Sequence, residues 1–165
     1  MNEALSASTG ESKVQQYQSD ALTTISGLEQ TLSLDAAALT GCADVVGGPA
    51  TIQCYSGRHV REVRHWRGVR VTQLLDLAGM QALPIGRRKQ SVIAVVAQDG
   101  YRCLFTWHEL YNTAVGSGVI LVVEEDGVAF DPDLGGLHLV SLRDLKLGPR
   151  QALAVSSIEV RQWQA

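Results

Sequence analysis

Short apolar runs, separated by polar and glycine-containing segments, divide the chain into many small elements. Residues 90–98 and 119–123 are apolar on both faces, which is typical of strands buried at the centre of a sheet. Six further runs are shorter or alternate between apolar and polar positions, and the pattern predicts roughly eight strands in total. These six runs are residues 21–25, 30–34, 50–55, 101–106, 137–142 and 156–163.

Turn and cap residues mark where these runs end. The glycine-containing pairs at 26–27, 99–100 and 126–127 predict tight turns between strands. Asp35 is expected to cap one short helix that ends before Gly41, and Thr72 to cap another that stops at Gly79. Residues 107–111 predict a third short helix. Short strands with a few inserted helices, and no regular alternation of the two, indicate an α+β fold with a mixed, largely antiparallel sheet.

Length and composition fit one globular domain. With 165 residues, of which 45% are hydrophobic, the chain can bury one substantial core. The 14 basic and 17 acidic residues give a net charge of −3, which is not typical of a nucleic-acid-binding domain. The longest apolar run, residues 92–97, is far shorter than the roughly 18–20 residues of a membrane-spanning helix. We therefore expect neither nucleic acid nor a membrane as a partner.

The first residues differ in character from the rest of the chain. They carry no basic region, no apolar core and no twin-arginine pair, so no export signal is visible. Residues 1–20 are expected to form a flexible polar tail, and residues 21–165 the folded domain. As written, the chain is expected in the cytoplasm, or in the periplasm if a signal peptide has been removed.

The segment 51–59, T-I-Q-C-Y-S-G-R-H, is the one place where a cysteine looks presented to solvent. Cys54 closes a strand and is followed by a glycine-containing turn that carries Arg58 and His59. Arg61, Arg64 and His65 follow, and such positive surroundings lower the pKa of a thiol and favour a nucleophilic or metal-binding thiolate. The alternative is that Cys54 is the last inward residue of a core strand with a solvated arginine rim. Cys42 and Cys103 are expected to be packing residues.

Four motifs in sequence order resemble the molybdopterin-binding domain of the sulfite oxidase family. They are Q-C-x-x-x-R at 53–58, W-x-G-V-x-V-x-x-L-L-x-x-A-G at 66–79, D-G-Y at 99–101 and G-G-L-H-L-V at 135–140. The resemblance extends from about residue 21 to the end of the chain, and the motif at 66–79 is its most specific part. It implies the mixed, largely antiparallel α+β fold of that domain.

The resemblance also implies a cofactor and its contacts. Cys54 would be the thiolate ligand of molybdenum, and Cys54 and Arg58 are the expected catalytic residues. Arg58 and Arg150 match arginines of the family pattern and are expected to hold the cofactor phosphate or a small anionic substrate. His59 stands where the family has a second arginine, and it is expected to contact the cofactor because it lies near Cys54. The implied reaction is oxygen-atom transfer to or from a small oxyanion or an S- or N-oxide, with an electron-transfer protein as partner.

The chain departs from the family pattern at several positions. Leu153 and Ala154 stand where the family has a lysine and a tryptophan, and only the polar tail stands in place of the N-terminal loops that enclose the pterin. Molybdopterin is therefore expected to be weakly bound or absent in the purified protein. The alternative is a cofactor-free binding module that keeps the fold and uses the basic pocket near Cys54 for an anion or a protein partner.

Overall fold

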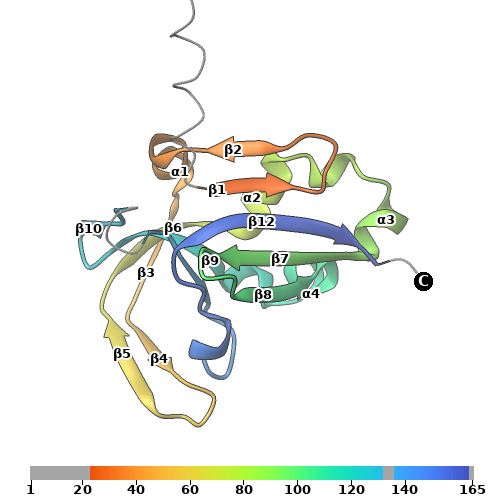
Figure 1. Cartoon of the computed structure of the whole chain (residues 1–165). Coiled ribbons are helices and arrows are strands. Elements are labelled where there is room, and N and C mark those ends of the chain that lie inside the picture. Colours follow the sequence, from red (N-terminus) through yellow and green to blue (C-terminus); the bar gives the residue numbers. More distant parts are fainter. Residues whose placement is uncertain (1–22, 132–135, 164–165) are drawn as a thin grey trace, which may run out of the picture.

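A computed structural model describes residues 23–131 and 136–163 (Figure 1). Within these residues the chain forms an α+β fold of short helices and mostly antiparallel sheets, as expected. The predicted tail at 1–20 lies outside the described residues. No helix in the described part of the chain is both long and apolar enough to span a bilayer.

The first sheet has the strand order β2-β1-β12-β7-β8. It consists of β1 (Thr23–Ser26), β2 (Leu32–Leu34), β7 (Ser91–Ala97), β8 (Arg102–Thr106) and β12 (Val155–Gln162). β1 runs parallel to β12, and the other neighbours in this sheet are antiparallel. The prediction that residues 90–98 form an inner strand is confirmed by β7.

The second sheet is built around β9 (Val119–Glu125). On one side β9 pairs with β6 (Trp66–Arg70), which in turn pairs with β3 (Val45–Gly47). On the other side β9 pairs with both β10 (Val128–Ala129) and β11 (His138–Ser141). The prediction that residues 119–123 form a buried central strand is confirmed.

A separate two-stranded hairpin extends away from these sheets. It consists of β4 (Ala50–Gln53) and β5 (His59–Val63). Figure 1 shows it alongside the segment that precedes β12. The hairpin is held by a small core of its own, formed by Ile52, Val63, Trp66, Ile120, Val122 and Val140.

The helices are short and pack mainly around the larger core between the two sheets. They are α1 (Ala36–Cys42), α2 (Val71–Leu77), α3 (Ile85–Lys89) and α4 (Trp107–Asn112), with one-turn 3-10 helices η1 (Met80–Ala82), η2 (Gly116–Gly118) and η4 (Gly148–Arg150). Leu74 and Leu75 of α2 and Leu110 of α4 belong to this core, together with Ile93 and Leu121.

Several boundaries differ from the sequence predictions. Asp35 does cap α1, since its carboxylate accepts from the Ala38 N–H at 2.8 Å, but the helix continues through Gly41. Thr72 is not a cap, because α2 already begins at Val71 and the N-cap is Arg70. The described residues form twelve strands rather than about eight; the prediction missed β3, β5 and β10. These three strands are short or largely exposed, so they leave little apolar signal.

We predict that Leu121→Ala lowers the free energy of unfolding by about 2–5 kcal/mol, because it opens a cavity where β9 faces the larger core. Chemical denaturation followed by circular dichroism measures this change. Val128→Ala is the control: Val128 is 69% exposed, and its truncation should change stability by no more than about 0.5 kcal/mol. Equal losses in the two variants would contradict the assigned packing of β9.

Candidate functional site

Cys54 lies at the start of the tight turn that joins β4 to β5. Its backbone N–H donates to the Arg58 carbonyl at 3.0 Å, and its own carbonyl accepts from the Gly57 N–H at 2.8 Å. Gly57 has a φ of 85°, a conformation that favours glycine. These two hydrogen bonds fix the position of the cysteine on the hairpin.

The Cys54 thiol is poised to ionise near neutral pH. Its Sγ lies 2.9 Å from the hydroxyl oxygen of Ser56, which can donate to a thiolate. This hydrogen bond is the largest influence and lowers the pKa of Cys54 to about 7; partial burial opposes it, while the Ser56 and Arg58 N–H groups and the Arg58 side chain reinforce it. The lowering that the sequence predicted is present, but its main cause is a neighbouring hydroxyl rather than a ring of basic residues.

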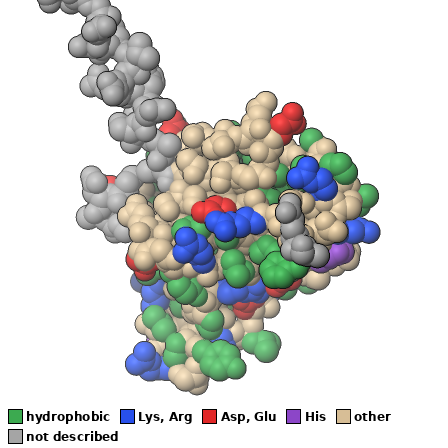
Figure 2. All heavy atoms as spheres, turned by 45° about the vertical axis from the view of Figure 1, so that its right-hand side comes forward, with side chains coloured by type: hydrophobic (Ala, Val, Ile, Leu, Met, Phe, Trp, Pro, Cys, Tyr) green, Lys and Arg blue, Asp and Glu red, His purple; other side chains and the backbone are tan. Residues whose placement is uncertain are grey.

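Cys54 borders a pocket of about 430 Å³. One wall comes from the hairpin, with Ile52, Tyr55 and Val60, and the opposite wall comes from Tyr101 and from η4 and the residue after it. The lining is therefore mostly apolar and aromatic. Figure 2 shows hydrophobic side chains gathered at the lower end of the molecule, where the hairpin lies, and Tyr55 there is 88% exposed.

Two cations lie close to the turn. Arg58 is exposed, and the ammonium of Lys146 donates to the Gln53 side-chain oxygen at 3.2 Å. A side chain built on Gly57 would place its Cβ 3.4 Å from the same ammonium. Neither Arg58 nor Lys146 forms an ion pair with another residue that the structure describes. Lys146 was not predicted at this site, because it lies 93 residues from Gln53 and no local pattern connects the two residues.

His59 is not brought to the thiol. Its Nε2 lies 3.2 Å from a carboxylate oxygen of Glu62, and the Thr51 hydroxyl donates to the same oxygen at 2.8 Å. These three residues form a small exposed polar cluster on the hairpin. His59 does not line the Cys54 pocket.

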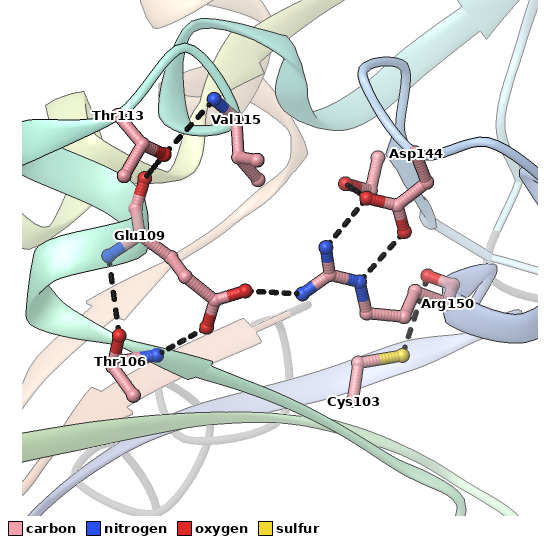
Figure 3. Close-up of polar contacts among 8 residues, drawn as sticks. Cys103, Thr106, Glu109, Thr113, Val115, Asp144 and Arg150 are labelled. Carbon is pink, nitrogen blue, oxygen red and sulfur yellow. Dashed lines mark hydrogen bonds and ion pairs between the residues drawn. The ribbon is translucent and has the colours of Figure 1, made fainter.

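Arg150 is also engaged elsewhere (Figure 3). Its Nε donates to Asp144 at 2.6 Å, a second nitrogen donates to the other Asp144 oxygen, and a third donates to Glu109 at 3.1 Å. The guanidinium also lies 4.4 Å from the centre of the Phe105 ring. Two carboxylates therefore neutralise the charge that the sequence assigned to a cofactor phosphate or substrate, and the structure does not bring Arg150 to an open anion site.

Of the remaining basic residues of the predicted rim, Arg61 is engaged through its side chain, whereas Arg64 and His65 are held through their backbone and keep exposed side chains. Arg61 forms an ion pair with Glu125 of β9 beneath the hairpin. The backbone N–H groups of Arg64 and His65 both donate to Asp126, at 3.0 and 2.8 Å. Arg58 is the only member of that predicted rim, among the described residues, whose side chain acts on the Cys54 thiol.

The other two cysteines have packing roles, as expected. Cys103 is buried, its thiol donates to the Arg150 carbonyl at 3.3 Å, and burial raises its pKa to about 11. Cys42 is half-buried against the larger core. Neither lines the pocket beside Cys54.

His138 belongs to a buried polar cluster rather than to the pocket. Its Nδ1 lies 3.7 Å from Glu125, the partner of Arg61, and its ring centre lies 4.1 Å from that of Phe130. Burial, followed by the charge of Arg61, lowers the pKa of His138 to about 4. His138 is therefore neutral at physiological pH and lies beside the ion pair that joins β5 to β9.

The chain matches no protein-family model, and no curated protein matches it. Within residues 23–131 and 136–163, no group of three or more His, Cys, Asp or Glu side chains could together hold a metal ion. The site is thus defined by a single ionisable thiol, two nearby cations and an apolar pocket wall.

We predict that Cys54 reacts with iodoacetamide with a pH midpoint near 7 and that Ser56→Ala raises this midpoint toward the ordinary thiol value, because the alanine cannot donate to the thiolate. Peptide-level mass spectrometry of native protein measures the rate at each cysteine. Cys103 in the same sample is an internal control and should react far more slowly. An unchanged midpoint in Ser56→Ala would rule out the hydroxyl as the main cause.

We predict that part of the protein's stability depends on neutral His138. Its pKa in the folded state lies below the ordinary value of 6.5, so the unfolded chain takes up a proton first as the pH falls. This contribution is complete above about pH 6.5 and is lost as the pH falls toward 4. Urea unfolding between pH 7 and 4.5 should therefore show a steeper loss for the parent than for His138→Gln.

His65→Gln removes an exposed histidine and is the matched control for loss of an imidazole. Parallel pH dependences for the parent and His138→Gln would show that burial of His138 does not couple protonation to unfolding.

Proposed function

We propose that the domain is a molybdopterin-binding oxidoreductase domain of the sulfite oxidase type, in which Cys54 supplies the thiolate ligand of molybdenum. The observation that carries this proposal is the Cys54 thiol, which borders a pocket and has a pKa of about 7. It stands in the 53–58 segment, where the sequence resembles the family motif. The α+β fold with largely antiparallel sheets is consistent with the proposal.

The donor set fits the metal end of this group. Molybdenum in molybdopterin takes its other ligands from the dithiolene and from oxo groups, so one soft thiolate is a sufficient protein ligand. A cluster of three protein ligands is not required. Arg58 and Lys146, which are not paired with carboxylates among the described residues, would hold the anionic part of the cofactor or substrate in place of His59 and Arg150.

When bound, the group supplies oxygen-atom transfer to or from a small oxyanion or an S- or N-oxide, with electrons passing singly to a partner protein. The protein's own residues have simpler tasks. The Ser56 hydroxyl and the N–H groups of the turn hold the Cys54 sulfur in its ionised form. Ile52 and Val60 contribute apolar surface to the pocket beside that sulfur.

A second candidate is a cofactor-free binding module. It is favoured by the carboxylate partners of Arg150 and His59, because an extended phosphorylated pterin needs several free cationic donors. Such a module would bind an anion at Arg58 and Lys146, or a protein that covers the exposed Tyr55.

The test is the molybdenum content of the protein made in two hosts. Because few cations remain free, we expect largely empty but folded protein from an ordinary host and partial loading from a host that overproduces molybdopterin. Cys54→Ser should reduce the molybdenum content of the latter at least tenfold, because the hydroxyl is a poor ligand for a soft site. Metal analysis by mass spectrometry, with unfolding curves for the empty protein, gives both results.

Cys42→Ser is the matched control and should load like the parent, since Cys42 lies outside the pocket. If the parent protein from the cofactor-rich host contained no more molybdenum than the background level, this result would contradict the oxidoreductase proposal and favour the binding module. Loading that survives Cys54→Ser would place the ligand elsewhere.

A further inference from the structure

One wall of the Cys54 pocket is pressed directly against the backbone of the cysteine. This wall begins at Gly148, the first residue of η4. A Cβ added to Gly148 would lie 2.4 Å from the Gln53 carbonyl oxygen and 3.2 Å from the Cys54 Cα. Because no side chain lies between the two backbones, a displacement of η4 directly changes its contact with Cys54.

The same wall is fastened to the first sheet at two successive carbonyl groups. The Pro149 carbonyl accepts from the Tyr101 hydroxyl, and the Arg150 carbonyl accepts from the Cys103 thiol at 3.3 Å. Tyr101 and Cys103 stand at the start of β8. Both contacts involve the backbone of η4, so they fix the distance between η4 and β8.

The Arg150 side chain adds a third attachment, which reaches across to α4 (Figure 3). The guanidinium joins Asp144, which precedes η4, to Glu109 in the first turn of α4, and it packs on Phe105 of β8. The other oxygen of Glu109 accepts from the Thr106 N–H at 2.9 Å and so completes the capping box of α4. The wall of the pocket is thereby joined to the end of β8 and the start of α4.

We infer that Arg150 is a positioning residue: its bonds to Asp144 and Glu109 hold η4 against Cys54 and so set the accessibility of the thiol. Asp144 and Glu109 require a planar, forked donor, and Phe105 requires a flat cation; lysine provides neither. Loss of this arrangement frees η4 to move away from the hairpin, which widens the pocket that Cys54 borders and eases the approach of a reagent to the sulfur. Arg150 therefore affects the site by holding η4 in place, and not by binding the cofactor or an anionic substrate itself.

This inference uses the proposed function only in treating Cys54 as the working group of the pocket. The positioning role is tested on metal-free protein, so it still holds if the protein fails to bind molybdenum. Conversely, an unchanged reaction rate of the thiol would overturn the positioning role and leave the molybdenum proposal standing. The probe is iodoacetamide, and the quantity compared is the rate for fully ionised Cys54 at the upper plateau of the pH profile.

We expect Arg150→Lys to raise this plateau rate at least threefold. Glu109→Gln should produce a smaller increase, since glutamine keeps the capping box but loses the charge that holds the guanidinium. Gly148→Ala should also raise the rate, because the added methyl group drives the wall away from Gln53 directly. Rates that stay within a factor of about 1.5 of the parent in all three variants would overturn the inference.

Amide hydrogen exchange separates positioning from general stabilisation. In Arg150→Lys, exchange should accelerate in residues 53–58 and 147–152, while the amides of β7 keep the parent's rates. A uniform acceleration that includes β7 would show that Arg150 only stabilises the whole fold, and would overturn the inference.

Two variants serve as matched controls. Arg161→Lys changes an exposed arginine that pairs with Glu159 on β12, and Gly86→Ala adds a methyl group that meets no atom within 4 Å. Both should keep the parent's plateau rate. If Arg161→Lys raised the rate as much as Arg150→Lys, the effect would follow from replacing any arginine by lysine, and the positioning role of Arg150 would be wrong.

Discussion

Strand β9 is packed on both faces, and the position of the Cys54 hairpin depends on that packing. Val119, Leu121 and Val123 face the larger core, while Ile120 and Val122 face the smaller core beneath the hairpin. The neighbouring strand β6 can approach only because residue 68 is glycine, since a Cβ there would lie 2.5 Å from Ile120. The hairpin is therefore placed by the same strand that organises the rest of the fold, although it pairs with neither large sheet.

The hairpin also meets β9 through charge. Arg61 on β5 pairs with Glu125 at the end of β9, and neutral His138 lies beside that carboxylate. A half-buried ion pair of this kind contributes little net stability, but it disfavours any register that leaves one charge without its partner. Apolar contacts thus hold the hairpin down, and the polar cluster defines where along β9 it sits.

The sequence was informative where burial imposes a local pattern. β7 and β9 could be predicted from their apolar runs, because a strand that is covered on both faces has apolar residues at nearly every position. β5 was not readable, since its alternation carries charged residues on an exposed hairpin. The helix cap at Thr72 was wrong because β6 passes directly into α2 and leaves no intervening loop for a capping residue.

The site was predictable only in part, for a related reason. Cys54 and Arg58 lie within one turn, so their proximity follows from the sequence. Glu109, Glu125 and Gln53 lie 41, 64 and 93 residues from the cations they contact, which are Arg150, Arg61 and Lys146. Only the tertiary fold therefore decides which cations keep a free charge, although Asp144 lies just 6 residues from Arg150. Several basic residues stand near the cysteine in the sequence, but the structure pairs Arg61 with Glu125 of a distant strand and His59 with Glu62 of its own strand.

The strand order of the first sheet has a consequence for how the protein is made. β12 follows every other described strand in the chain, yet it lies between β1 and β7 and joins them. During synthesis the β1–β2 hairpin and the β7–β8 hairpin therefore leave the ribosome with open edges and no contact between them in this sheet. The sheet closes only when β12 emerges, so those edges stay open to pairing with other chains until the last described strand is made.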